Sequence, residues 1–328
     1  MEQKEVLLII PAYNEEKNIG KVMDQLAQPE IAELVDVLVM NDASSDNTIW
    51  MVKQRGYAVI THVFNLGYGS GLQLGYKYAI RRGYRYVIQM DADGQHDVCN
   101  IRKIYEKLKE KDTDGRTPDI VLGSRFMDGS AEFSVGFAKK LAFRLFRRML
   151  HIATGRWIAD PTTGLQGLSR KAVLYYSKYN HFDDKYPDTN MITQMMLLDF
   201  KVVEIPAVMH IRTSGTSMHS GLKPIWYMTR MFYKMFQIHC SVSECHLRFF
   251  LCCLETCLEL VRCLCDTHSF SPTAKCCLNN DWITNLTSDL LAFFYSIDRL
   301  LASRNNRNTC FHHRISCNGF ISKSTDHL

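Results

Sequence analysis

The chain has 328 residues, of which 46% are apolar and 22% charged, so it can form one large or two modest domains with an ample core. Its net charge of +5 is too weak to indicate a nucleic-acid-binding protein by itself. No stretch reaches about 18 uncharged apolar residues, which excludes a membrane-spanning helix on the usual length criterion. The first apolar run is too short for a signal-peptide core, so we expect a protein of the cytosol.

Short apolar runs alternate with helical periodicity from residue 5 to residue 206. This alternation predicts an α/β fold with a mostly parallel central sheet and helices on both faces. Ligands bind such sheets beyond the carboxyl ends of the strands, so the loops after the apolar runs are the candidate site. The expected strands are 6–11, 35–42, 57–61, 85–91, 119–124 and 201–206, and the expected helices are 16–28, 46–55, 70–82, 97–110 and 188–199, with Asp46 and Asp97 as N-caps.

The first two expected strands end in polar loops. In the sequence PAYNEE, Pro11 ends the strand, Tyr13 offers a flat ring to a nucleobase, and Glu15 can accept hydrogen bonds from the base. In the sequence NDASSDNT, Asp42 can accept hydrogen bonds from a ribose or a base, and the next residues open a helix. Taken singly, each loop is weak evidence for a nucleotide site, because helix caps use the same residue types.

The glycine-rich segment NLGYGSGLQLG, residues 65–75, lacks the spacing of a dinucleotide-binding loop. The pattern G-x-G-x-x-G requires a glycine where Leu72 stands, and the segment does not follow the first strand. A dehydrogenase with a Rossmann fold is therefore a poor alternative.

The sequence QMDADGQHD, residues 89–97, places two carboxylates directly after an expected strand. Asp91 and Asp93 are two residues apart, so in an extended segment their side chains project the same way. Two carboxylates aimed at one point suit a hard divalent ion, Mg²⁺ or Mn²⁺, shared with substrate phosphates. On these residues alone a solvated Asp/Gly turn remains the alternative.

Two later segments, near residues 134–154 and 222–237, have one basic and one apolar face. The first sets Arg144, Arg147 and Arg148 opposite an apolar stripe. Such a helix can lie in a membrane interface or pack its apolar face on the core, and the sequence leaves both open.

Composition changes near residue 239. Eleven of the 12 cysteines lie at or after residue 240, and periodicity is lost. We expect a domain of residues 1–238 and a loosely ordered tail, 239–328, which could also be a reading-frame artefact. A zinc module or a disulfide scaffold is the alternative, but no paired C-x₂-C spacing and no secretion signal favours either.

Together the loops form a specific pattern. PAYNEE, NDASSD, DADGQHD and GSRF (123–126) stand in the order and spacing of family 2 glycosyltransferases with the GT-A fold. The sequence resembles their dolichol-phosphate-mannose-synthase-like, or polyprenyl-phosphate, branch over about residues 5–237. DPTTG (160–164) and the R-x-x-G-x-S segment that begins at Arg212 resemble that branch as well.

The resemblance implies a metal-dependent, inverting transfer of a sugar from a UDP- or GDP-linked donor to a polyprenyl phosphate. It implies Mg²⁺ or Mn²⁺ as cofactor, a base that would activate a hydroxyl acceptor, and two arginines for an acceptor phosphate. The residues so assigned are Pro11, Tyr13, Glu15, Asp42 and Asp91 at the nucleotide, Asp91, Asp93 and Gln95 at the metal, and Asp93, Arg125, Asp188 and Arg212 at the reaction.

The resemblance also implies a peripheral protein on the cytoplasmic face of a membrane. It leaves room for a separate membrane protein as a partner and gives no role to nucleic acid. Two alternatives stay open: a transferase of the same fold that acts on a saccharide or cell-envelope hydroxyl, and a nucleotide-sugar-binding protein without turnover.

Overall fold

The computed structural model describes residues 3–127, 137–210, 231, 234 and 235. The chain divides into two units, Met1–Leu260 and Val261–Leu328, and the described residues all belong to the first. The expected tail, 239–328, and most of the expected helix at 222–237 lie outside the described residues.

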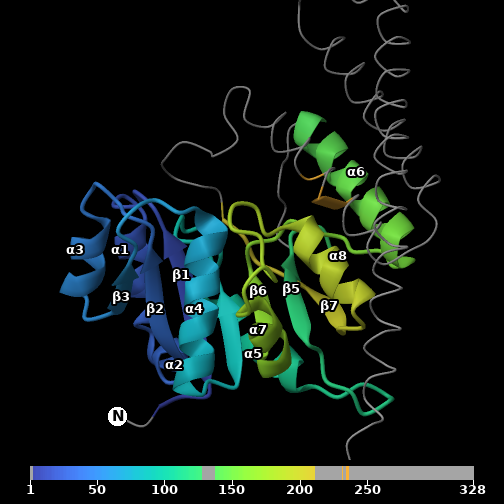
Figure 1. Ribbon diagram of the computed structural model, residues 1–328. Coiled ribbons are helices and arrows are strands. Elements are labelled where there is room, and N and C mark those ends of the chain that lie inside the picture. Colours follow the sequence, from blue (N-terminus) through green and yellow to red (C-terminus); the bar gives the residue numbers. More distant parts are fainter. Residues whose placement is uncertain (1–2, 128–136, 211–230, 232–233, 236–328) are drawn as a thin grey trace, which may run out of the picture. The chain divides into compact units, whose positions relative to one another are not determined.

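A seven-stranded sheet forms the centre of the first unit (Figure 1), with the strand order β3-β2-β1-β4-β6-β5-β7. All neighbouring strands are parallel except β6, which runs antiparallel to β4 and β5. The prediction of a mostly parallel sheet is confirmed, whereas the short strand β6, with the sequence QGLS, was not expected because it has no alternating pattern. The strands are β1 Val6–Ala12, β2 Val35–Asn41, β3 Ala58–Thr61, β4 Tyr86–Gln89, β5 Ile120–Ser124, β6 Gln166–Ser169 and β7 Val202–Pro206.

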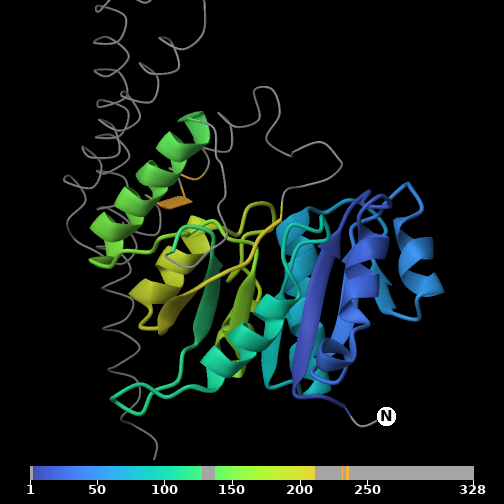
Figure 2. The ribbon, with the colours of Figure 1, turned by 180° about the vertical axis from the view of Figure 1, so that it is seen from behind.

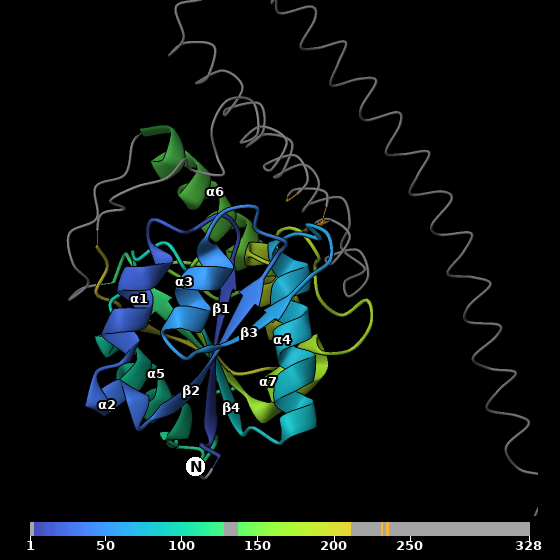
Figure 3. The same cartoon turned by 90° about the vertical axis from the view of Figure 1, so that its left-hand side faces the viewer.

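Helices cover both faces of the sheet, which is why β1 is buried along its whole length. One core cluster joins the sheet to α1, α3 and α5, and the other joins it to α4, α7 and α8. Figure 2 shows the reverse face of Figure 1, and Figure 3 shows the sheet between the two helical layers. The helices are α1 Ile19–Leu26, α2 Pro29–Ala32, α3 Thr48–Gln54, α4 Tyr68–Arg82, α5 Cys99–Lys109, α6 Phe137–Thr154, α7 Arg170–Tyr176 and α8 Thr189–Leu197.

The two expected N-cap aspartates lie one residue further from their helices than predicted. Asp46 Oδ1 accepts the backbone N–H of Thr48 at 3.0 Å, and Asp97 Oδ1 accepts that of Cys99 at 2.8 Å. Both carboxylates therefore satisfy a first-turn donor, although the residues at the N-cap positions are Asn47 and Val98.

The basic amphipathic helix expected near 134–154 is α6. Its apolar side is packed inside the protein, since Phe146 and Leu150 are buried, while Arg144 and Arg148 are exposed. Of the second basic segment, Met231 and Met235 are also buried. Among the described helices none is both long enough and apolar enough to cross a bilayer.

Candidate active site

The loops that follow β1, β2, β4 and β5 lie at one edge of the sheet. β1, β2 and β4 are parallel, and β5 has the same direction because β6 between β4 and β5 is antiparallel to both. Pro11 does not end β1, which continues to Ala12 beside β2. It ends only the pairing with β4, which stops at Ile9. The residue without an N–H thus separates β1 from β4 at this edge and opens the sheet there.

The first two loops are bound to each other by reciprocal hydrogen bonds. The side chain of Asn14, a residue with φ of 54°, accepts the N–H of Ser45 at 2.8 Å. Glu16 N donates to Asp46 Oδ2 at 3.1 Å, and Asn47 N donates to Glu16 Oε2 at 3.1 Å. The loops predicted to hold a nucleotide therefore form one unit before any ligand is present.

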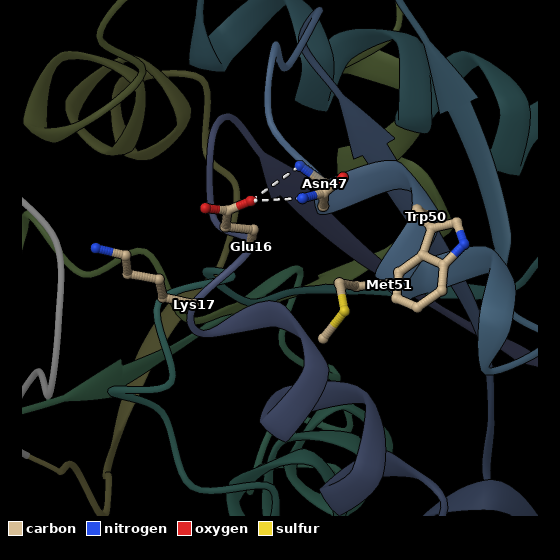
Figure 4. Close-up of a pocket in the computed structure, with 5 residues that line it drawn as sticks. All are labelled: Glu16, Lys17, Asn47, Trp50 and Met51. Atoms are coloured by element: carbon tan, nitrogen blue, oxygen red, sulfur yellow. Dashed lines mark hydrogen bonds between the residues drawn. The ribbon is translucent and has the colours of Figure 1, made fainter.

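An open depression of about 570 Å³ adjoins this loop pair, and Figure 4 shows its lining. Glu16 faces Asn47, and the exposed ring of Trp50 stands on α3. None of the residues assigned to the reaction lines this depression, which is formed by Glu16, Lys17, Asn47, Trp50 and Met51.

Tyr13 and Glu15 have different surroundings. The ring of Tyr13 is 50% exposed at the sheet edge, as a ring that stacks on a base requires. Glu15 is turned toward α1, where its Oε2 accepts from Asn18 Nδ2 at 2.6 Å, while its backbone N–H donates to Thr48 Oγ1 at 2.8 Å. Glu15 thus also holds the first loop in place.

Asp42 is buried and organises the loop after β3. Its carboxylate accepts the backbone N–H groups of Leu66 at 2.9 Å and Gly67 at 2.8 Å, and lies 2.8 Å from His62 Nδ1. Gly67 has φ of 100°, which a residue with a side chain rarely adopts. A carboxylate has about four acceptor positions, so the protein itself occupies most of those of Asp42.

Asp91 follows β4, and its side chain is half-buried. Tyr68 Oη donates to its Oδ1 at 2.9 Å, and His96 Nε2 lies 3.3 Å from its Oδ2. Burial raises the pKa of Asp91, but His96, the Tyr68 hydroxyl and the charge of Arg125 outweigh burial and hold that pKa below its ordinary value. A Cβ at Gly164 would lie 2.3 Å from Asp91 Oδ2, so a larger residue there would have to displace the Asp91 carboxylate.

The rest of the DADGQHD loop is attached to the chain that leaves β7. Gln95 N donates to Asp93 Oδ1 at 3.0 Å, and Gln95 O accepts from the N–H of His210 at 2.7 Å. His210 Nε2 lies 2.8 Å from Asp97 Oδ2. Arg212 itself lies outside the described residues, but the position two residues before it is fixed to the carboxylate loop.

The donor chemistry of this loop fits a shared divalent ion. In the described ranges, no three His, Cys, Asp or Glu side chains are grouped to hold a metal alone. Mg²⁺ and Mn²⁺ commonly use one or two protein carboxylates and take their other ligands from substrate phosphates and water. Asp91 and Asp93 match that partial set. Gln95 contacts Asp93 and His210 through its backbone, and the role of its side chain at a metal stays a prediction.

Arg125, which follows β5, is held by a buried carboxylate. Its Nε and Nη2 donate to the two oxygens of Asp160 at 2.6 and 2.7 Å, and Nη2 also donates to Thr162 at 2.9 Å. Burial lowers the pKa of Arg125, but its bond to Asp160 and the charges of Asp160, Asp91 and Asp188 raise it above its ordinary value. The guanidinium therefore lies in the electrostatic field of both the metal loop and Asp188.

Asp188 precedes α8 at the same edge. Its charge raises the pKa of Tyr68, the residue that also contacts Asp91, although burial is the larger cause. Gly69, beside Tyr68, touches the loop before α8 so closely that an added Cβ would lie 2.0 Å from the carbonyl oxygen of Asp183. The structure thus brings together Asp91, Arg125 and Asp188 of the sequence-predicted residues.

Sequence reasoning missed the residues that hold these groups. Tyr68, His96, Asp160 and Gly164 all contact a predicted site residue. His96, Asp160 and Gly164 stand inside motifs that the sequence singled out, DADGQHD and DPTTG, so those motifs were the available signal. Tyr68 stands in the glycine-rich segment 65–75, and only the structure shows its contact with Asp91.

Comparison with known proteins agrees with this architecture. The model of the family described as "Glycosyl transferase family 2" matches residues 7–176. An uncharacterized protein of Methanocaldococcus jannaschii is 28% identical over 168 residues, 51% of this chain and 66% of that protein. The undecaprenyl-phosphate mannosyltransferase of Micrococcus luteus is 29% identical over 225 residues, 66% of this chain and 88% of that protein.

A solved structure has the same fold. Glucosyl-3-phosphoglycerate synthase from Mycobacterium tuberculosis, crystallised with Mn²⁺, uridine diphosphate and phosphoglyceric acid, aligns with a TM-score of 0.55. The alignment covers 74% of this chain and 80% of that chain, at 18% identity. At this identity the likeness concerns the fold alone.

Proposed function

We propose, from the premise that the chain belongs to glycosyl transferase family 2, that it moves a sugar from a nucleotide-sugar to a polyprenyl phosphate. The chain is a glycosyltransferase, and the acceptor is the part that needs support. One relative is an undecaprenyl-phosphate mannosyltransferase, and its name contains such an acceptor. The observation that carries the proposal is Arg125, a cation that buried Asp160 holds in place and whose pKa the charges of Asp91 and Asp188 help to raise.

On the donor side, the joined first two loops would hold the nucleotide. The half-exposed Tyr13 ring offers a surface for the base, and the preformed loop contacts spare the protein an ordering cost on binding. Asp42 would act through the loop that it clamps as well as by direct contact. Binding measurements with uridine and guanosine diphosphate would distinguish uracil from guanine as the base.

On the metal side, Asp93 would be the main ligand, with Asp91 beside it. Tyr68 and His96 each contact one oxygen of Asp91, so Asp91 would also orient the loop and add negative charge. A bound Mg²⁺ or Mn²⁺ supplies neutralisation of the departing diphosphate. Tyr68 and His96 would keep the Asp91 carboxylate in one orientation before and after the metal binds.

On the acceptor side, a phosphate monoester is mostly dianionic at pH 7, since its second pKa is about 6. Such a nucleophile needs cations more than it needs a base. Arg125 would attract and orient it, and Arg212 would be the second cation.

A hydroxyl acceptor is the second candidate, and Asp188 is the observation that favours it. A hydroxyl loses its proton as it attacks, and a carboxylate at the start of α8 that influences Tyr68 could take this proton. Under this alternative Asp188→Asn should remove nearly all turnover, whereas Arg125→Ala should be mild. Under the phosphate proposal the order of the two effects is reversed.

A peripheral position on the cytoplasmic face of a membrane would suit a lipid acceptor. Arg144 and Arg148 are exposed one helical turn apart on α6. Trp157 is 63% exposed and stacks on His151 at 4.2 Å. Exposed arginines and a half-covered indole are the side chains that anionic membrane interfaces favour.

The test is an incubation of the full chain with Mn²⁺ or Mg²⁺, undecaprenyl phosphate and a panel of UDP- and GDP-sugars, with analysis of the lipid product. A sugar phosphate lipid supports the proposal. Transfer only to saccharide hydroxyls would replace it by the second candidate. Nucleotide-sugar binding without transfer or release of nucleoside diphosphate would leave a binding protein.

A further inference from the structure

Glu204 has no assigned part in the reaction, yet it is connected to Arg125 through Asp160. It belongs to β7, the edge strand next to β5, and is half-buried. Its Oε2 accepts the backbone N–H of Ala159 at 2.7 Å, and its Oε1 accepts that of Asp160 at 2.8 Å. One carboxylate thus holds two successive amides of the segment that carries Asp160.

Asp160 passes this constraint to Arg125. It is fully buried, accepts the backbone N–H of Arg125 at 3.0 Å, and accepts the guanidinium through both oxygens. A bidentate pair fixes the plane of the guanidinium as well as its position. A rotation of the backbone at Ala159 and Asp160 would break the two bonds to Glu204.

The carboxylates of Glu204 and Asp160 repel each other, and a neutral side chain that accepted the same two amides would avoid this repulsion. Burial raises the pKa of Glu204, and the nearby charge of Asp160 raises it further, while the Ala159 and Asp160 amides and the Ser124 side chain lower it. Two carboxylates are therefore placed close together behind one arginine. A neutral acceptor would bind a turn without this repulsion, so the second charge favours a role in orienting Arg125.

We propose that Glu204 is a positioning residue for the acceptor site: it fixes Asp160, and Asp160 fixes the guanidinium of Arg125 where the acceptor phosphate binds. This inference rests on the proposed function. It gives β7 two tasks, because the chain that leaves the same strand carries His210 to the carboxylate loop and continues to Arg212.

The chain provides a matched control at the other end of the same two strands. Asp119, which precedes β5, is also buried, and its carboxylate accepts the backbone N–H of Lys201 at 2.9 Å, just before β7. Asp119→Asn removes a buried carboxylate from the same strand pair, far along the strands from Arg125. Glu204→Gln keeps the shape of the side chain but can accept only one of the two amides well.

The first measurement is steady-state kinetics of the full chain with undecaprenyl phosphate, for Glu204→Gln, Arg125→Lys, the double variant and Asp119→Asn. We expect Glu204→Gln to lower kcat/KM for the acceptor about 10- to 100-fold, with the donor KM within about twofold of wild type. In the double variant, Glu204→Gln should add little to the loss caused by Arg125→Lys, because both act on one group. Asp119→Asn should lower the unfolding temperature and leave acceptor kinetics unchanged.

The second measurement does not depend on turnover: the ¹⁵N–¹H resonance of Arg125 Nε, assigned by its loss in Arg125→Lys. The Nε proton of Arg125 should exchange slowly with solvent in wild type and in Asp119→Asn, and rapidly in Glu204→Gln. If Glu204→Gln misfolds, Glu204→Asp replaces it and should shift both measurements less in the same direction.

The outcomes separate the two ideas. No transfer to the lipid, or a fully active Arg125→Lys, would overturn the proposed function, and the resonance would still test the link from Glu204 to Arg125. A damaged Arg125→Lys with normal Glu204→Gln kinetics, additive losses, or an unchanged Arg125 resonance would overturn the role of Glu204 alone.

Discussion

Asp91 is defined by what surrounds it rather than by its motif. A tyrosine hydroxyl and an imidazole contact its two oxygens, and the backbone of Gly164 closes over it. The sequence predicts that Asp91 and Asp93 project together if they continue a strand, but β4 ends at Gln89 and both residues lie in the turn that follows it, so this stays a prediction. It could not predict Tyr68, which stands 23 residues earlier, at the start of α4. Residues that act through another side chain leave little local pattern.

Asp93→Asn should abolish transfer while the fold stays intact. The amide is neutral and a poor ligand for a hard divalent ion, so the expected loss is at least about 100-fold in kcat/KM. Circular dichroism and Mn²⁺ titration calorimetry with nucleoside diphosphate present would show an unchanged fold and lost metal binding. Asp24→Asn, at a surface pair with Arg55, is the control and should behave as wild type. Near-normal, metal-dependent activity of the Asp93 variant would refute the metal assignment.

Gly164→Ala should impair turnover about 100-fold, because the new methyl group must displace the Asp91 carboxylate or the loop above it. The control is Gly71→Ala in α4, where the nearest atom is Met40 Cβ at 3.8 Å. That change should keep full activity and raise the free energy of unfolding by about 0.5–1 kcal/mol. Equal activity of the two variants would mean that Asp91 tolerates displacement.

Among the elements, long periodic segments were predictable and short irregular ones were not. The apolar run of β1 and the helical pattern of α5 each specify one structure locally. β6 has four residues, two of them polar, and forms because β4 and β5 lie on either side of it. Whether such a short segment forms a strand depends on its tertiary pairing, so the sequence after DPTTG predicts only a turn.

The contacts between the first two loops should respond to acid through Asp46. Burial raises the pKa of Asp46, but hydrogen bonds from Thr48 and Glu16 outweigh burial and hold that pKa below its ordinary value. Because the folded pKa is the lower one, Asp46 contributes stability above about pH 4 and loses it as pH falls through the folded pKa. Asp46→Asn should cost about 1 kcal/mol at pH 7 and flatten this part of the pH profile.

Urea unfolding of wild type and Asp46→Asn between pH 2 and pH 7 measures this effect. Asp114→Asn, in an exposed turn, provides the comparison and should follow the wild-type profile. Parallel profiles for wild type and Asp46→Asn would show that the carboxylate charge does not stabilise the loop pair.

The exposed cations of α6 should bind anionic lipid. The double variant Arg144→Gln/Arg148→Gln should weaken partitioning onto phosphatidylserine vesicles by about 1 kcal/mol per charge. Arg147 is left in place because its guanidinium lies over the Phe126 ring at 4.8 Å, so its loss would also disturb packing. Lys53→Gln/Lys103→Gln removes two exposed cations from α3 and α5 and is the control. Equal partitioning of the two double variants would remove α6 from the membrane contact.

For the whole molecule, the sequence predicts a domain that ends near residue 238, and this boundary lies outside the described residues. The described residues belong to the compact unit Met1–Leu260. A chain ending after Leu260 should unfold in one cooperative transition, as a unit with its own core does. A chain ending after residue 200 lacks β7 and with it the pairing of Val202–Pro206 to β5. It should lose the transition or aggregate. Loss of cooperativity in the longer chain would mean that the remaining residues are part of the core.

The strand order also sets when each half of the site can form on a nascent chain. β1, β2 and β3 are neighbours and consecutive, so the joined loops and the Asp42 clamp are complete once Gly67 has been made. The Arg125 clamp must wait for Asp160 and then for Glu204, after nearly 140 more residues have been added. Chains fold from the N-terminus as synthesis proceeds. A ribosome that stalls after β4 and before β6 would carry a partly folded chain with the joined loops formed and one edge of β4 unpaired. An unpaired strand edge can associate with another chain.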